Sequence, residues 1–180
     1  MLRAVASILL LMQLAHTSAH AGGGNYEPPR PPRISAPTRD AKAFYVEFRA
    51  RKESGGYGHS YVTLGTFNGA GRSRQTVVAG FTPKGPDDDF LGGLALPVSG
   101  SVGLTKSDLV RRPDVTFRVR ISREQYNVAV RRIHGLRRSW TTYSLLGQNC
   151  SDFTGQFAHW IGLRTPMAGA RLPVGYVSEL

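Results

Sequence analysis

The chain has 180 residues, of which 41% are hydrophobic and 19% are charged, which suits one packed globular domain and excludes global disorder. Lysine and arginine number 23 against 12 aspartate and glutamate residues, a formal net charge of +11 that favours anionic partners. The single cysteine, Cys150, excludes an intramolecular disulfide and any cysteine-rich metal site.

Residues 1–21 have the pattern of a secretory signal peptide. Arg3 follows the amino terminus, residues 4–14 are mostly apolar, and Ala19-His20-Ala21 has the small-x-small cleavage pattern. The apolar run is shorter than the roughly 20 residues that a membrane-spanning helix needs. We therefore expect cleavage after Ala21 and a secreted or periplasmic chain without a stable membrane span. A buried N-terminal helix is the alternative.

Residues 22–40 are predicted to form a basic linker, because they are rich in glycine and proline and carry several arginines. The folded domain is predicted to cover residues 41–180. Alternation of apolar and polar side chains predicts four strands. They cover residues 44–48, 59–66, 75–81 and 115–121. Residues 82–114 are predicted to be a functional loop or to hold short elements that the pattern does not resolve.

Two helices complete the predicted domain. The motif Ser122-x-x-Gln125 is a capping box, and apolar residues follow it at helical spacing as far as Leu136. A second helix is predicted from Asn149 to about Gly162. Antiparallel strands combined with at least two helices define an α+β fold.

The predicted chemistry centres on Cys150. It follows Asn149, a favoured N-cap residue, and so occupies the first turn of the second helix. The helix dipole and free backbone N–H groups there are expected to lower the thiol pKa and to stabilise an oxyanion. The alternative is that Cys150 is a small buried hydrophobic residue.

A nucleophilic thiol needs a base, and the predicted domain contains three histidines. His159 lies nine residues after Cys150, which on a helix is about 13 Å away and on the opposite side. His134 is surrounded by arginines and is predicted to lie on the surface. His59 begins a strand directly after a glycine-rich segment, and it is the remaining candidate base. An ordinary histidine at a strand end is the alternative.

Two motifs carry a resemblance to a known family: Tyr57-Gly58-His59-Ser60-Tyr61-Val62, and Gln148-Asn149-Cys150-Ser151-Asp152-Phe153. Their order resembles the circularly permuted NlpC-type papain-like thiol hydrolases, which include the lecithin:retinol acyltransferase-like proteins. The resemblance covers about residues 43–163. It implies a small papain-like core, in which an antiparallel sheet packs against the cysteine helix and the histidine strand precedes that helix.

The resemblance also implies supporting residues. Such families orient the histidine with a third polar group on the neighbouring strand. The position that faces His59 is predicted to lie close to Gly80, with Gln75 and Thr82 as the nearest polar candidates. Tyr143 resembles an upstream tyrosine that lines this family's site, and core packing of its ring is the alternative.

The expected function is that of an exported cysteine hydrolase of the peptidase or amidase type, cleaving an amide of peptidoglycan stem peptides through a thioester. The alternatives are a lipid acyl hydrolase or acyltransferase of the same fold, and a non-catalytic module that binds the cell envelope. An anionic envelope polymer or lipid is the expected partner. No metal, cofactor or nucleic acid is expected, because the chain lacks the corresponding motifs.

Overall fold

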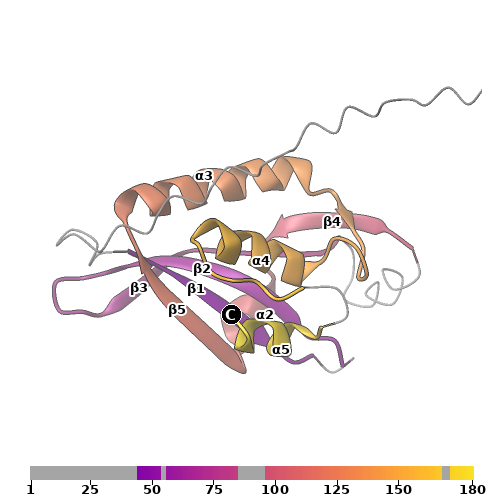
Figure 1. The fold of residues 1–180 in the computed structure, drawn as a ribbon, viewed down its shortest axis with the longest axis horizontal. Helices are drawn as coiled ribbons and strands as arrows, with labels where there is room; N and C mark the ends of the chain where they lie inside the picture. The colour runs from indigo at the N-terminus through magenta and orange to yellow at the C-terminus, as the bar shows by residue number, and fades with distance from the viewer. Residues whose placement is uncertain (1–43, 54–55, 85–95, 168–170) are drawn as a thin grey trace, which may run out of the picture. The chain divides into compact units, whose positions relative to one another are not determined.

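The computed structural model describes residues 44–53, 56–84, 96–167 and 171–180. The predicted signal peptide and linker lie outside these residues. The described strands form one antiparallel sheet in the order β5-β1-β2-β3-β4-β6 (Figure 1). Their bounds are β1 (Phe44–Arg51), β2 (His59–Phe67), β3 (Ser73–Pro83), β4 (Val98–Gly103), β5 (Val115–Ile121) and β6 (Thr142–Tyr143). The described helices are α2 (Lys106–Val110), α3 (Arg123–Ser139), α4 (Cys150–Trp160) and α5 (Pro173–Ser178). The predicted α+β class is confirmed.

Alternation along the strands gives the sheet two different faces. On β1, Phe44, Val46 and Phe48 belong to the hydrophobic core, as do Val62 and Leu64 on the paired strand β2. The core also contains buried residues of α3, α4 and α5, so these three helices cover this face. Burial of these apolar side chains is the main driving force that holds the helices on the sheet.

The opposite face, called here the polar face, carries charged and aromatic side chains. Glu47 of β1 is only 3% exposed, and it forms ion pairs with Arg49 on its own strand and Arg118 on β5. The Arg118 guanidinium lies 4.3 Å from the centre of the Tyr45 ring. The long arginine side chains therefore cover the aromatic rings of this face while their charges are neutralised.

The two predicted helix starts are confirmed. Ser122 caps α3 in a capping box with Gln125, and Asn149 caps α4 in a capping box with Asp152. Of the helices that the structure describes, none has the length and apolarity needed to cross a membrane.

The region 82–114 contains two elements that the sequence pattern did not resolve, and α5 was not predicted either. Strand β4 has the sequence Val-Ser-Gly-Ser-Val-Gly, whose small residues give little alternation. Gly100 is required there, because an added Cβ would lie 2.5 Å from the Phe81 ring. Helix α2 has five residues, too few to show a helical period. Residues 85–95 of this region lie outside the described residues.

Candidate active site

Cys150 is the first residue of α4, and its N-cap is built by Asn149. The Asn149 side-chain oxygen accepts hydrogen bonds from the backbone N–H groups of Ser151 (2.7 Å) and Asp152 (3.2 Å). Its amide nitrogen donates to the Leu145 carbonyl (2.9 Å), which fixes the side chain in place. Because the cap uses the second and third N–H groups of the helix, the N–H of Cys150 is the one left to stabilise charge at this terminus.

Helix α4 is fastened to the start of β2 by a polar contact inside the core. The hydroxyl of Thr154 bonds both the Ser60 hydroxyl (3.1 Å) and the Cys150 carbonyl (2.9 Å). Thr154 and Ser60 are both fully buried, so this contact is shielded from water. It brings the first turn of α4 against the first residues of β2.

The thiol at this junction is shifted toward its ionised form. Burial would raise the pKa of Cys150, but a hydrogen bond and charge from His59 lower it, and the backbone and hydroxyl of Ser60 add to that effect. The result is a pKa below the ordinary value of a cysteine. A stabilised thiolate is the form in which cysteine acts as a nucleophile. Cys150 is only 3% exposed, so the thiol is almost fully shielded from solvent.

Tyr143 lies against the same sulfur. Burial raises the pKa of its hydroxyl well above the ordinary value, and the charge of Cys150 and a hydrogen bond to it raise it further. The hydroxyl therefore stays protonated at neutral pH and serves as a donor beside the thiol. The ring also packs into the core, 5.4 Å from that of Phe81. The two alternatives weighed for this residue, site lining and core packing, are both present.

The His59 ring, at the start of β2, is held by two neighbours. It stacks on Tyr61, with ring centroids 5.7 Å apart and planes 10° from parallel. Beneath it lies Gly80, where an added Cβ would be 2.6 Å from His59 Nε2. Gly80 is paired with Tyr61, so continuing the register places Thr82 level with His59. The sequence predicted that the position facing His59 lies close to Gly80. The His59 ring does contact Gly80, but the residue level with His59 in the strand pairing is Thr82.

The acidic residue nearest to the histidine is Asp108 of α2, which sequence reasoning missed. Its Oδ1 atom lies 3.7 Å from His59 Nε2, beyond hydrogen-bond length, and also accepts a hydrogen bond from Arg51. Its Oδ2 atom accepts from the Thr105 N–H (2.7 Å) in a capping box. The side chain of Asp108 is 1% exposed, and Arg51 and the Thr105 N–H hold its two oxygens in place. The motif Thr105-x-x-Asp108 is a sequence signal that could have located it.

Of the other candidates, Thr82 is level with His59 on the neighbouring strand, and the remaining three lie elsewhere. Gln75 pairs with Gly65, six residues along β2 from His59 or roughly 20 Å, and its amide accepts from Arg49 (3.0 Å). Thr82 is half-buried on β3 and pairs with Ser101. His134 and His159 are exposed on α3 and α4. Of the predicted set, His59, Tyr143 and Asn149 come together with Cys150.

The chain matches no family model, no curated protein and no solved structure. Within the described residues, no three histidine, cysteine or acidic side chains are grouped to hold a metal ion. The site is thus defined by its own geometry: a thiol with a lowered pKa at a helix N-terminus, an imidazole beside it and a buried carboxylate behind the imidazole. That arrangement can activate a nucleophile and stabilise a developing oxyanion.

Proposed function

We propose that the protein is a cysteine hydrolase of the papain-like type, in which Cys150 is the nucleophile and His59 the general base and acid. The observation that carries the proposal is the position of Cys150, which is the first residue of a capped helix and contacts His59, a contact that also lowers the pKa of the thiol. A cysteine that only packs in a core lacks such a partner, and burial then raises its pKa.

The steps of the reaction follow from the positions of these groups. The Cys150 thiolate attacks the carbonyl carbon of an amide, and the Cys150 N–H and Tyr143 hydroxyl stabilise the oxyanion that forms. The C–N bond breaks as protonated His59 gives its proton to the leaving nitrogen, leaving a thioester on Cys150. Water then attacks the thioester while His59 takes its proton, and the carboxylic acid and thiol are released.

Asp108 is proposed to hold the imidazole from behind. Its distance of 3.7 Å from Nε2 is longer than a hydrogen bond, which is common for catalytic contacts in the absence of substrate. A buried carboxylate also favours the imidazolium that forms during the reaction. Arg51 shares the carboxylate and keeps it in place.

The substrate we propose is an amide in the stem peptides of peptidoglycan, and the chain is proposed to be exported to reach it. Cleavage after Ala21 removes one arginine and no acidic residue from the chain of net charge +11, and the remaining charge of +10 would concentrate the enzyme on anionic envelope material. Export is checked by sequencing the N-terminus of the secreted or periplasmic form, which should begin at Gly22. An intact Met1 on a stably folded cytoplasmic protein would contradict it.

A second substrate class is favoured by one observation. The segments that carry Asp108 and Asn149 also expose large apolar side chains, namely Leu109 (59%), Val110 (70%) and Leu146 (74%). Exposed apolar residues of this kind suit an acyl chain better than a peptide. The same thiol would then attack an ester, and the enzyme would be a lipid acyl hydrolase or acyltransferase.

The experiment compares purified peptidoglycan with phospholipid vesicles as substrates. Wild type, Cys150→Ala and His59→Ala are incubated with each, and the products are identified by mass. The matched control is His159→Ala, an exposed histidine on the cysteine helix, which should keep wild-type activity. Turnover that survives Cys150→Ala would overturn the thiol mechanism. Tight binding of either material without turnover by wild type would identify a binding module instead.

A further inference from the structure

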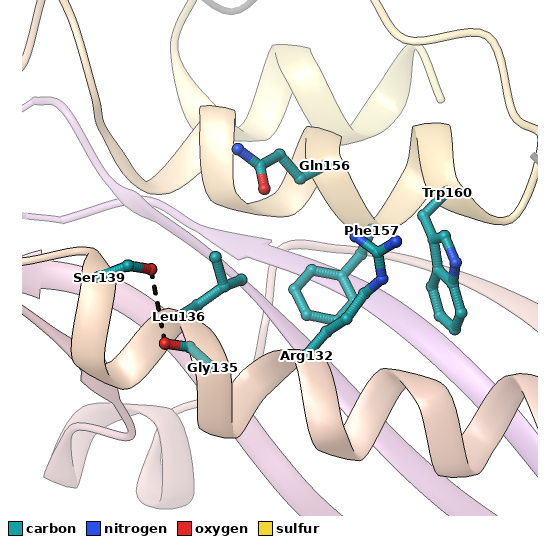
Figure 2. A pocket seen from close by; sticks show the side chains of 7 residues that line it. All are labelled: Arg132, Gly135, Leu136, Ser139, Gln156, Phe157 and Trp160. Atoms are coloured by element: carbon teal, nitrogen blue, oxygen red, sulfur yellow. Dashed lines mark hydrogen bonds between the residues drawn. The ribbon is translucent and has the colours of Figure 1, made fainter. Parts of the chain in front are cut away.

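A cavity of about 300 Å³ lies between α3 and α4, away from the thiol. Figure 2 shows the residues that line it, which are Arg132, Gly135, Leu136, Ser139, Gln156, Phe157 and Trp160. Those on α3 follow the spacing of one helix flank, and those on α4 begin six residues after Cys150, roughly 9 Å along the axis. The cavity is within the size range of small-molecule sites.

Its lining is mostly apolar, with two uncharged polar side chains, Ser139 and Gln156, and one positive charge. Leu136, Phe157 and the Trp160 ring supply hydrophobic surface, and the Arg132 guanidinium lies 5.4 Å from the centre of that ring. Among the described residues, no acidic side chain pairs with Arg132. Its charge is therefore available to an anion, while the ring holds the guanidinium in place.

Gly135 is a second, independent observation. Glycine weakens the interior of a helix, and an added Cβ at Gly135 would meet no neighbouring atom within 4 Å. Close packing therefore does not require a glycine at this position. Gly135 is one of the residues that line the cavity, so the absence of a side chain at this position leaves part of the cavity open.

We propose that this cavity binds a linear alkyl chain with a single anionic head group, represented by an alkyl carboxylate. The chain would lie on Leu136, Phe157 and Trp160, and the carboxylate would bind Arg132. The volume of about 300 Å³ lies at the lower end of the range of small-molecule sites, which suits a short chain. The proposal uses no feature of the thiol site, so Cys150→Ala should bind the ligand as wild type does.

The test is a titration with hexanoate, octanoate and decanoate below the concentrations at which they form micelles. Binding is followed by the fluorescence of Trp160, because the other tryptophan, Trp140, is buried against Phe81. We expect saturable binding at one site, with Kd falling about threefold to fourfold for each added methylene. Decanol and decyltrimethylammonium should bind at least about tenfold more weakly than decanoate, because neither gives Arg132 an anion.

Three variants locate the ligand. Arg132→Gln should weaken decanoate binding about tenfold, whereas the matched control Arg131→Gln, an exposed neighbour outside the cavity, should change it less than about twofold. Gly135→Leu should abolish binding by filling the cavity. The circular dichroism spectrum of each variant shows whether it folds. If Gly135→Leu does not fold, the comparison of Arg132→Gln with Arg131→Gln still tests the proposal. Equal weakening in the two arginine variants, unchanged binding in a folded Gly135→Leu, or Kd values independent of chain length would each overturn the proposal.

Discussion

An added Cβ on Gly80 would lie 2.6 Å from Nε2 of His59, so the catalytic imidazole of the proposed enzyme occupies space that only glycine leaves free. The same Cβ would lie 2.9 Å from Cε1 and 3.1 Å from the Cβ of Tyr61. The ring is therefore confined between the β3 backbone and the Tyr61 ring. A side chain at position 80 would have to displace it.

Gly80→Ala should separate the imidazole from the thiol. We expect kcat/KM to fall at least tenfold and the pKa of Cys150 to rise, at a cost of about 1–3 kcal/mol in the free energy of unfolding from overpacking. The matched control is Gly103→Ala, because Gly103 pairs with Gly80 on β4 and an added Cβ there meets no atom within 4 Å. Wild-type activity in folded Gly80→Ala would show that the ring position does not matter.

The pKa of the thiol can be measured directly. The rate of alkylation of wild type by iodoacetamide should rise with an apparent pKa below the ordinary cysteine value of about 8.5. His59→Gln should raise that pKa, because it removes the largest of the interactions that lower it. His134→Gln, an exposed histidine on α3, should leave it unchanged. An apparent pKa at or above 8.5 in wild type would contradict the assigned site.

The same shift makes stability depend on pH with a definite sign. Because the folded thiol has the lower pKa, the unfolded chain binds the proton more tightly, and folding is favoured as the thiol ionises. The free energy of unfolding of wild type, relative to Cys150→Ala, should be largest above about pH 8.5 and should fall as pH drops through the folded pKa. Chemical denaturation at several pH values checks this. A difference that grows toward acid pH would mean that the thiol pKa is raised.

Asp108 can be tested apart from its ion pair with Arg51. Both side chains are buried, so Arg51→Gln, which leaves the Asp108 carboxylate without its cation, should lower the free energy of unfolding by about 3–5 kcal/mol. Asp108→Asn should lower it by less, because Arg51 keeps its ion pair with Glu53 (2.8 Å). If Asp108 positions His59, Asp108→Asn should also lower kcat about tenfold or more and raise the thiol pKa, whereas Arg51→Gln, which leaves the carboxylate present, should have smaller effects on both. Asp114→Asn removes a carboxylate that accepts a hydrogen bond from the Lys52 N–H, and it should change neither kcat nor the thiol pKa. Equal losses of kcat in Asp108→Asn and Arg51→Gln would reduce Asp108 to a structural role.

Local signals predicted most of the elements of the fold. The alternation in residues 44–48 and 115–121, and the caps at Ser122 and Asn149, depend on neighbouring residues only, and the corresponding elements are present. The prediction that His59 is the partner of Cys150 came from the exclusion of His134 and His159 and from two short motifs. In the structure His59 and Cys150 are each the first residue of an element.

What local patterns could not supply is the identity of the group behind the histidine. The prediction looked along the neighbouring strand, at Gln75 and Thr82, whereas Asp108 comes from a one-turn helix after β4. A register irregularity between Leu64 and Gly65 also shifts the pairing of β2 with β3, and no residue pattern fixed its position. Long-range pairing of this kind is set by how whole elements pack.

The last prediction concerns Gly155, in the middle of α4, where α5 packs on the cysteine helix. An added Cβ would lie 2.1 Å from the Tyr176 hydroxyl oxygen, and burial raises the pKa of that hydroxyl to about 12, with Asp152 adding to the shift. Tyr176 is 1% exposed and belongs to the core, so it has no room to retreat. Gly155→Ala should therefore lower the free energy of unfolding by about 1–3 kcal/mol.

Gly135→Ala is the matched control for that change, because it makes the same substitution inside α3 where the new Cβ meets no atom. It should raise the free energy of unfolding by up to about 1 kcal/mol, since alanine is the better helix former. Tyr176→Phe removes the oxygen that Gly155→Ala would strike, so the double variant should be more stable than the sum of the two single changes predicts. Chemical denaturation of wild type, Gly155→Ala, Tyr176→Phe and the double variant measures this coupling. If Gly155→Ala stabilised the protein as Gly135→Ala is expected to, α5 would not pack on α4 through the Tyr176 hydroxyl.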